Sequence, residues 1–446
     1  MTTILQDAAA WILQKSSPQA DLLVEIFASR TRQFEIEIRD QQVDNMRQAD
    51  EQGLGIRVFK RGSMGFSFTT DFSPQALETC LQTAIFGANV TNPEEHWGLP
   101  APASEYPQLS LWDKEINTIS IEQKRKLALE LETAARSYDQ RVAITESSAY
   151  SDWQQEIVIA NSLGINTGFR ASGCLLSIYI VAREQDDNQT GFSFQQERRF
   201  TALNPQRTGQ EAARQAVAML GAQKIPTCQV PVIFDPLVGA SFLGVLAPAF
   251  SAESVFKGKS FLATKLATSI NSKITLVDDR TYQPGMAAAP FDAEGVVGRR
   301  NVLIQDGLLQ TWLHNTVSGR RQATASSGNA VRSSFRATPE IGTSNFFLLP
   351  GPDDQATLVG SISRGLLINE VMGMHSVNTI SGDFSVGAAG HWIENGEKQF
   401  PVRGIMIAGN LLELMQNIES IGSDTRFMGG KGSPSLLIGR LTVAGE

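Results

Sequence analysis

The sequence offers few side chains of the types that hold a catalytic metal ion. Its four histidines are spread along the chain, and no His-Glu-x-x-His pattern occurs. A catalytic zinc site needs three protein ligands that converge on one point. His375 and Asp383 could meet across a turn, and His391 opens a His-x-x-Glu pattern in a predicted strand and hairpin. These three residues are the candidate metal ligands; the competing interpretation is that each histidine packs in a strand or caps a turn.

Patterns that could supply a nucleophile or a phosphate site are incomplete. Ser254 and Lys257 match Ser-x-x-Lys, but the Ser-Asp-Asn and Lys-Thr-Gly elements that accompany it in penicillin-binding enzymes are missing. Residues 239–241 begin a nucleophile elbow that lacks its closing glycine. In 429–435 the lysine is followed by glycine, so the order of a phosphate-binding loop is broken. We therefore predict no catalytic residue.

Length and composition favour a two-domain globular protein without a nucleic-acid or membrane partner. The chain has 446 residues, and a single core stops growing at roughly 250–300 residues. The net charge is −8, and basic residues form no stripe with neighbouring aromatic residues, as a nucleic-acid interface would require. No window approaches about 18 uninterrupted apolar residues, so a membrane-spanning helix is not expected.

Cysteine usage and the N-terminus favour a cytoplasmic location. The three cysteines, Cys80, Cys174 and Cys228, are widely separated, which fits a reducing compartment and excludes a paired-cysteine metal site. The N-terminal segment carries Asp7 within its apolar stretch and has no basic region before it. It therefore predicts an amphipathic helix rather than a signal peptide.

The N-terminal half predicts a domain of mixed helix and sheet. Apolar and charged residues alternate over 34–39, which is typical of a half-buried strand, and 53–69 predicts two strands around a turn. Three more strands, over 142–153, 155–164 and 173–184, are expected to pair as antiparallel meanders. The proline-rich segment 91–115 is expected to be an exposed loop. Helices are expected over 3–16, from Ser73-Pro74 onward, over 120–139 and over 199–222.

The pattern changes after 223–227, which we interpret as the boundary between a domain of residues 1–222 and a domain of residues 223–446. The second half is rich in glycine and in turn signals, and Asn395-Gly396 is a strong hairpin signal. It predicts a β-rich barrel or sandwich. One clear helix is expected within 409–422, capped by Asn410. The chain as a whole is thus expected to have an α+β fold.

Several phrases of the sequence resemble one known family. They are GNAVR at 328–332, the segment 380–397, IAGNLL at 407–412, the segment 432–445 and, in the first half, the segment 53–69. Together, in this order and spacing, they are similar to proteins of the PmbA/TldD family over nearly the whole chain. The resemblance is closer to the PmbA branch, also called TldE, than to the TldD branch.

The resemblance implies a metallopeptidase complex that acts on unfolded peptides in proteolysis and peptide maturation. In the TldD branch a His-Glu-x-x-x-His motif and a later cysteine bind the catalytic metal, and the TldE chain is the partner. In this sequence the matching stretch, 241–254, has no histidine, and the cysteine position falls near Gly429. We therefore expect this chain to bind no metal itself, and a metal, with zinc as the first choice, to sit in a TldD-like partner.

Three functional hypotheses remain open. The first is a non-catalytic subunit that pairs with a TldD-like chain and helps to hold an extended peptide. The second is an independent metallopeptidase with relocated ligands, and the third is a homodimeric peptide-binding module. Strand addition would suit a β-rich domain, and the glycine- and serine-rich segments 328–345 and 376–390 are the predicted peptide-facing surface; the competing interpretation is that their glycines serve only turns. The predicted peptide-binding residues are Gly328, Asn329, Ser381, Gly382, Asp383 and Ser385.

Overall fold

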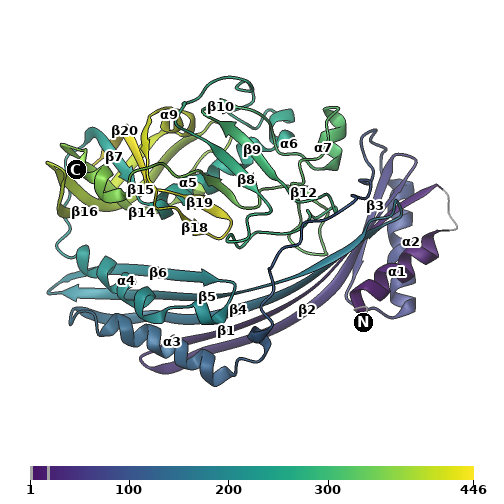
Figure 1. Ribbon diagram of the computed structural model, residues 1–446, viewed down its shortest axis with the longest axis horizontal. Helices are drawn as coiled ribbons and strands as arrows, with labels where there is room; N and C mark the ends of the chain where they lie inside the picture. Colours follow the sequence, from purple (N-terminus) through teal and green to yellow (C-terminus); the bar gives the residue numbers. More distant parts are fainter. Residues whose placement is uncertain (1–3, 18–20, 446) are drawn as a thin grey trace.

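The computed structural model describes residues 4–17 and 21–445 and shows an α+β protein in two stacked halves (Figure 1). The N-terminal half is built on one antiparallel sheet of long strands, in the order β3-β2-β1-β4-β5-β6. The strands are β1 (Leu22–Arg39), β2 (Gln42–Lys60), β3 (Ser63–Thr69), β4 (Val142–Asn161), β5 (Asn166–Glu184) and β6 (Asp187–Glu197).

Two pairs of helices cover one face of this sheet, one pair towards each end (Figure 1). Side chains alternate between the faces of a strand, so the even-numbered residues of β1 share the helix-covered face. Those from Val24 to Ala28 pack with the first pair, and those from Phe34 to Ile38 pack with the second. The odd-numbered residues, Glu25 and Phe27 among them, are left on the face that meets the C-terminal half. The first pair is α1 (Ile4–Ser16) with α2 (Pro74–Val90), and the second is α3 (Ile121–Arg136) with α4 (Pro205–Ala218).

The C-terminal half contains a closed five-stranded barrel. Its strands follow each other in the order β16-β15-β14-β7-β20, and β16 also pairs with β20, which closes the ring. A further strand, β17 (Ile418–Ile421), pairs with β20. The barrel strands are β7 (Cys228–Phe234), β14 (Arg364–Met372), β15 (Asp383–Glu394), β16 (Glu397–Asn410) and β20 (Leu436–Ala444).

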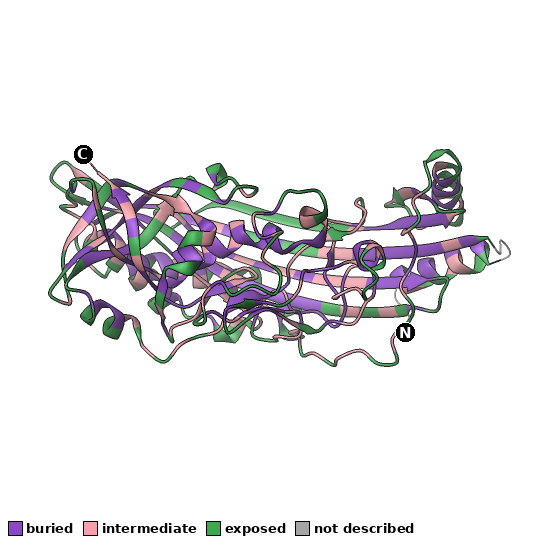
Figure 2. Cartoon of the chain, turned by 90° about the horizontal axis from the view of Figure 1, so that it is seen from above, coloured by how far each residue is buried: buried purple, intermediate pink, exposed green. Residues whose placement is uncertain are grey.

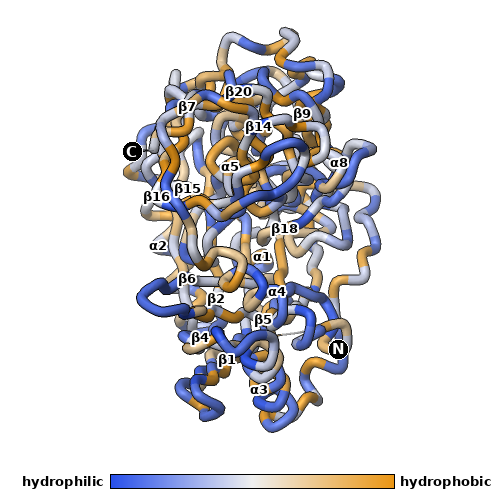
Figure 3. Tube along the Cα trace, turned by 90° about the vertical axis from the view of Figure 1, so that its left-hand side faces the viewer, coloured by the Kyte–Doolittle hydropathy of each residue, from blue (hydrophilic) through white to orange (hydrophobic). Residues whose placement is uncertain are grey.

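A second sheet, in the order β10-β9-β8-β13-β19-β18, lies beside the barrel. The helix α5 (Pro236–Leu246) is packed between the two, and apolar segments gather around it (Figure 3). The strands are β8 (Leu276–Asp279), β9 (Arg300–Gln305), β10 (Leu308–Leu309), β13 (Phe346–Leu348), β18 (Arg426–Met428) and β19 (Lys431–Ser433), with a separate ribbon of β11 (Ala330–Val331) and β12 (Glu340–Ile341). The short helices are α6 (Ala252–Phe256), α7 (Thr316–Arg321), α8 (Gln355–Gly360) and α9 (Leu411–Gln416).

The predicted α+β class, with a β-rich barrel in the second half, is confirmed. Local signals were also read correctly. Ser73 caps α2, with Pro74 in its first turn. Asn395 and Gly396 both have positive φ, at 52° and 77°, and connect β15 to β16 as a tight hairpin. Asn410 caps α9 by accepting the N–H of Leu412 at 2.9 Å.

Several predicted boundaries were wrong. The strand expected over 173–184 begins at Asn166, and the helix expected over 199–222 spans only Pro205–Ala218. Two further differences have a clear cause. β4 runs without a break from Val142 to Asn161, where the sequence suggested two strands, because it pairs with β1 on one side and β5 on the other. The helix expected within 409–422 ends at Gln416, and the chain then enters β17, which pairs with β20. In both places pairing with distant strands decides where the element ends.

The segment 91–115 lacks helices and strands up to residue 114, as expected for a loop, but it is not exposed throughout. It leads from α2 at one end of the sheet to α3 at the other (Figure 1). Leu99 and Leu111 are buried, and their carbonyl oxygens accept hydrogen bonds from the Arg320 side chain and from the N–H of Ser172. The loop is thus part of the contact between the two halves.

Buried stretches run along the long strands, but exposed stretches occur on them too (Figure 2). The first part of β2, residues 42–51, is exposed throughout, whereas residues 53–59 are buried. Among the described residues, no helix combines the length and the apolar character that crossing a membrane requires.

Candidate functional site

Two charged residues of the long sheet lie on the face that meets the C-terminal half. Glu25 of β1 and Arg57 of β2 are directly opposite each other in the strand register. Their sequence neighbours, such as Val24 and Ile56, point to the first helix pair, so alternation along the strands leaves the two charged side chains at the junction. The Glu25 side chain is fully buried, and only 3% of the Arg57 side chain is exposed.

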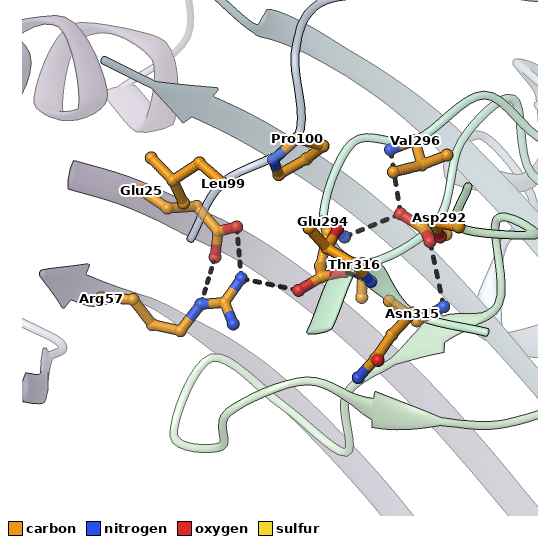
Figure 4. A network of polar contacts seen from close by, with 12 residues as sticks. Glu25, Arg57, Leu99, Pro100, Asp292, Glu294, Val296, Asn315 and Thr316 are labelled. Atoms are coloured by element: carbon orange, nitrogen blue, oxygen red, sulfur yellow. Dashed lines mark hydrogen bonds and ion pairs between the residues drawn. The ribbon is translucent and has the colours of Figure 1, made fainter. Parts of the chain in front are cut away.

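The C-terminal half completes an ion network around this pair (Figure 4). Arg57 donates to the two carboxylate oxygens of Glu25 at 2.9 and 2.6 Å, and to Glu294 at 3.0 Å. Arg332 also donates to Glu25. The second oxygen of Glu294 accepts the N–H of Thr316, at the start of α7, at 2.8 Å. Two carboxylates therefore face two guanidinium groups, and the buried network has no net charge.

The network remains ionised because its members are paired. Burial by itself raises the pKa of Glu25, but Arg57 and Arg332 outweigh burial, so the pKa lies below its ordinary value. Taking each charge out of water costs several kcal/mol, which only good geometry and complete hydrogen bonding offset. The network therefore fixes the position of the second half on the sheet, since a shift would leave buried charges without partners.

A second group of buried polar residues lies behind the network, in the C-terminal half. Asp292 accepts the N–H groups of Glu294 and Val296 at 2.9 Å and that of Ala330 at 3.0 Å, which holds the turn that presents Glu294 (Figure 4). Burial, together with the nearby charge of Glu294, raises the pKa of Asp292 to about 6. Asp278 is fully buried and accepts hydrogen bonds from neighbouring residues of its own half.

Two cavities open at the junction. The first, of about 420 Å³, lies between β1 and the C-terminal half. The second, of about 1060 Å³, is bounded by residues 104–109, the last part of β4 and the first part of β5. Both are lined in part by Ile157 and Phe169. The first cavity lies within the range of about 300–1,000 Å³ that is usual for ligand sites. Its lining includes Phe27, Ser29, Thr31, Gln33, Arg280, Phe291, Asp292, Ala330, Arg332, Ser333 and Phe335.

Of the predicted peptide-binding residues, Gly328 and Asn329 lie next to this junction. Gly328 has a φ of +76°, and its carbonyl oxygen accepts a hydrogen bond from Arg280 at 2.9 Å. Asn329 is fully buried, and its amide donates to Asp278 at 2.6 Å and to the carbonyl oxygen of Gly342 at 3.0 Å. Both residues shape the loop that leads into β11, whose residues Ala330 and Val331 line the first cavity.

The other predicted peptide-binding residues lie in the barrel, at the start of β15. Ser381, Asp383 and Ser385 are exposed, whereas Gly382 is buried and has a φ of +84°. Asn410 donates to the Asp383 carboxylate at 2.8 Å and to the carbonyl oxygen of Ser381 at 3.0 Å. The structure therefore does not gather the six predicted residues into one surface.

The candidate metal ligands are also not brought together. His391 lies eight residues beyond Asp383 on β15, which at about 3.3 Å per residue separates them by roughly 25 Å. Its ring nitrogens are within hydrogen-bond distance of the Asn369 side chain and the Ala218 carbonyl oxygen, at 2.9 and 3.3 Å. His375 lies in a short 3-10 turn before β15. Among the described residues, no group of three His, Cys, Asp or Glu side chains is placed to hold a metal ion.

The stretch 241–254, where the TldD branch would carry its metal motif, packs as apolar core. Phe242 and Leu246 of α5 are buried, and α5 lies against β18 and β19, on either side of Gly429. A side chain at position 239 would overlap the hydroxyl of Ser433. The one carboxylate of the stretch, Glu253, pairs with Arg321 at 2.8 Å and Lys257 at 3.0 Å. The residues present do not fit a metal ion.

The sequence interpretation missed the ion network. One signal was available, because an isolated charged residue inside an apolar strand is rare unless it is paired: Glu25 interrupts LLVEIF and Arg57 interrupts GIRVF. The partners Glu294 and Arg332 lie in loops more than 200 residues away and carry no such pattern. Arg332 does end the GNAVR phrase that carried part of the resemblance.

Comparison with known proteins agrees with this architecture. Three family models match the chain in succession: PmbA/TldA metallopeptidase domain 1 over 24–88, the central domain over 114–220 and the C-terminal domain over 227–445. The protein is 30% identical to "Metalloprotease PmbA" of Escherichia coli O157:H7, over 99% of this chain and 96% of that protein. It is 28% identical to "Metalloprotease PmbA homolog" of Haemophilus influenzae, over 99% and 96%.

Solved structures share the same fold. A Thermotoga maritima protein described as a candidate modulator of a DNA gyrase has a TM-score of 0.92 and 27% identity, and the match covers 98% of this chain and 100% of that one. TldE from Thermococcus kodakarensis has a TM-score of 0.91 and 24% identity, with coverage of 98% and 100%. With family models along almost the whole length and a full-length relative at 30% identity, the chain belongs to the PmbA/TldD family.

Proposed function

We propose that this chain is the non-catalytic, TldE-like subunit of a two-chain metallopeptidase that acts on unfolded peptides. A TldD-like partner holds the metal ion, with zinc as the expected metal, and this chain helps to hold the peptide. The observation that carries the proposal is the packing of 241–254 as apolar core around α5, with no side chain free to bind a metal. Without a bound metal there is no activated water on this chain.

The identities of the relatives support the choice of branch. Proteins named as PmbA or its homologues are 28–30% identical to this chain, whereas homologues named as TldD are 24–25% identical. The cysteines support a cytoplasmic location for the complex. Cys80, Cys174 and Cys228 are all unpaired, as expected in a reducing compartment.

The test is to measure metal content and peptide cleavage for the purified chain alone, for a TldD-like partner alone and for an equimolar mixture. We expect stoichiometric metal and cleavage of an unstructured peptide in the mixture, and neither in this chain alone. Replacing His375 or His391 with alanine in this chain should leave the activity of the mixture unchanged.

Two results would contradict the proposal. Stoichiometric metal and cleavage by this chain alone, lost in His375→Ala or His391→Ala, would establish an independent metallopeptidase with relocated ligands. A tight homodimer in analytical ultracentrifugation that binds peptides but does not respond to the TldD-like chain would establish a self-contained binding module.

A further inference from the structure

An arginine at the edge of the first junction cavity has unused hydrogen-bonding capacity. Arg280 follows β8, and only 8% of its surface is exposed. Its Nε donates to the Gly328 carbonyl oxygen at 2.9 Å. Its Nη2 is buried and, within the described part of the chain, has no hydrogen-bond partner. A buried guanidinium nitrogen without an acceptor is costly, so the group is suited to receive one from a ligand.

The neighbouring carboxylates do not fill this need. Asp278 uses its oxygens for Asn329 and for the N–H and hydroxyl of Ser344. Asp292 uses its own for three backbone N–H groups. The charge of Arg280 acts on both carboxylates and favours their ionised form, but neither carboxylate forms an ion pair with Arg280. The two carboxylates thus balance the positive charge of Arg280, while the Nη2 group of Arg280 remains available to donate a hydrogen bond.

The cavity beside Arg280 has the lining of a peptide site. Its volume is about 420 Å³, and its walls include Phe27, Phe169, Phe291 and Phe335. Phe27 belongs to β1, and Ser29, Thr31 and Gln33 of this strand also line the cavity. Because they alternate along the strand, their polar groups lie in a row on one face. Aromatic walls favour an apolar side chain, and a row of hydroxyl and amide groups can pair with the amide groups of an extended chain.

We propose that this cavity binds the C-terminus of an extended peptide, with the free α-carboxylate held by the guanidinium of Arg280 and an apolar last side chain between the phenylalanines. A carboxylate can accept two parallel hydrogen bonds from a guanidinium, which is strong and geometrically selective. That the ligand is a peptide rests on the proposed function; the carboxylate site itself rests on Arg280. The site would give this subunit a preference for peptide ends.

The test uses the full chain alone, without metal or partner, so that it does not depend on the cleavage assay. A fluorescently labelled five-residue peptide ending in leucine is titrated by anisotropy, once as the free acid and once as the C-terminal amide. We expect the acid to bind about tenfold more tightly or better, as for a charge-assisted bidentate contact. In Arg280→Gln the acid should bind no better than the amide.

Two further variants control for folding and for net charge. Ser333→Trp places a large side chain at the exposed rim of the cavity and should weaken both peptides, even if Arg280→Gln proves unstable in thermal melting. Arg47→Gln removes the same charge from an exposed position on β2 and should bind like the wild type.

Equal binding of acid and amide to the wild type, no saturable binding of either, or a preference for the acid that survives in Arg280→Gln would overturn the carboxylate site. If N-acetyl-leucine competes as well as the peptide does, the ligand is a small carboxylate and the assignment to a peptide is overturned. Failure of cleavage in the mixture with a TldD-like chain would contradict the proposed function but not these binding results.

Discussion

Replacing Arg57 with methionine should destabilise the protein far more than the same replacement on its surface. In Arg57→Met, Glu25 keeps Arg332, but Glu294 keeps only the N–H of Thr316, and the buried network acquires one uncompensated negative charge. Removing one partner of a buried ion pair costs about 3–5 kcal/mol. That corresponds to a loss of roughly 150- to 5,000-fold in the folding equilibrium constant.

The matched control lies on the neighbouring strand of the same sheet. Arg30 of β1 forms a similar two-pronged contact with Asp50 of β2, at 2.9 and 2.6 Å, but the two side chains are 35% and 41% exposed. Exposed pairs contribute about 0.2–1 kcal/mol. Arg30→Met should therefore move the urea midpoint only slightly, whereas Arg57→Met should lower it strongly, as followed by circular dichroism.

A second substitution makes the test specific to charge. Glu294→Gln should destabilise the wild type, because it leaves Arg57 with one carboxylate fewer. In the Arg57→Met background it should instead be stabilising, because it removes the uncompensated carboxylate. If Arg57→Met costs no more than Arg30→Met, or if Glu294→Gln is equally destabilising in both backgrounds, the network does not hold the junction as described.

Three further predictions concern other parts of the molecule. The pKa of Asp292 is raised to about 6 in the folded state, above its value in the unfolded chain, so the stability that its protonated form contributes should be present below pH 4 and lost as the pH rises through 6. Urea midpoints measured from pH 4 to 7 should show this loss for the wild type but not for Asp292→Asn. Parallel curves for the two proteins would contradict the prediction. Gly65→Ala should lower the free energy of unfolding by about 1–3 kcal/mol or more, because a Cβ there would overlap the backbone of α2 at Ala84. Gly244→Ala, which has open space around it, should be neutral or raise the free energy of unfolding by about 0.4–1 kcal/mol. Thermal melting of the two variants measures the difference. Asn410→Ala removes the α9 cap and the hydrogen bonds to Ser381 and Asp383. It should therefore lower the free energy of unfolding by about 1 kcal/mol and speed amide hydrogen exchange at 376–383. Unchanged exchange there would show that these hydrogen bonds do not order the segment.

The sequence was sufficient where structure depends on neighbours along the chain. The Ser73 and Asn410 caps, the Asn395-Gly396 hairpin and the β-rich character of the second half all follow from a few adjacent residues. It was insufficient where distant strands decide, as in the continuity of β4 from Val142 to Asn161. Its alternation is interrupted by polar residues, and only pairing with β1 and β5 shows that the strand continues.

The candidate site could not be assembled from local patterns for the same reason. Arg280 and Glu294 lie in loops of the second half; Glu294 meets Arg57 of β2, and Arg280 lines the same cavity as residues of β1. Of the two predicted peptide-facing segments, 328–345 lies at the junction, where residues 330–335 line the first cavity, whereas 376–390 leads into β15 of the barrel. Only the fold shows that GNAVR ends in an arginine that meets Glu25.

The ion network also constrains the order in which the protein forms during synthesis. Arg57 and Glu294 are separated by 237 residues, and ribosomes add about 5–20 residues per second. The last strand of the N-terminal sheet ends at Glu197, so the sheet can pair its strands roughly 7–27 seconds before Arg332, the last ionic partner, is added. During that interval Phe27 and the Glu25–Arg57 pair stay uncovered, and the nascent chain presents an apolar, charged face that chaperones are suited to shield.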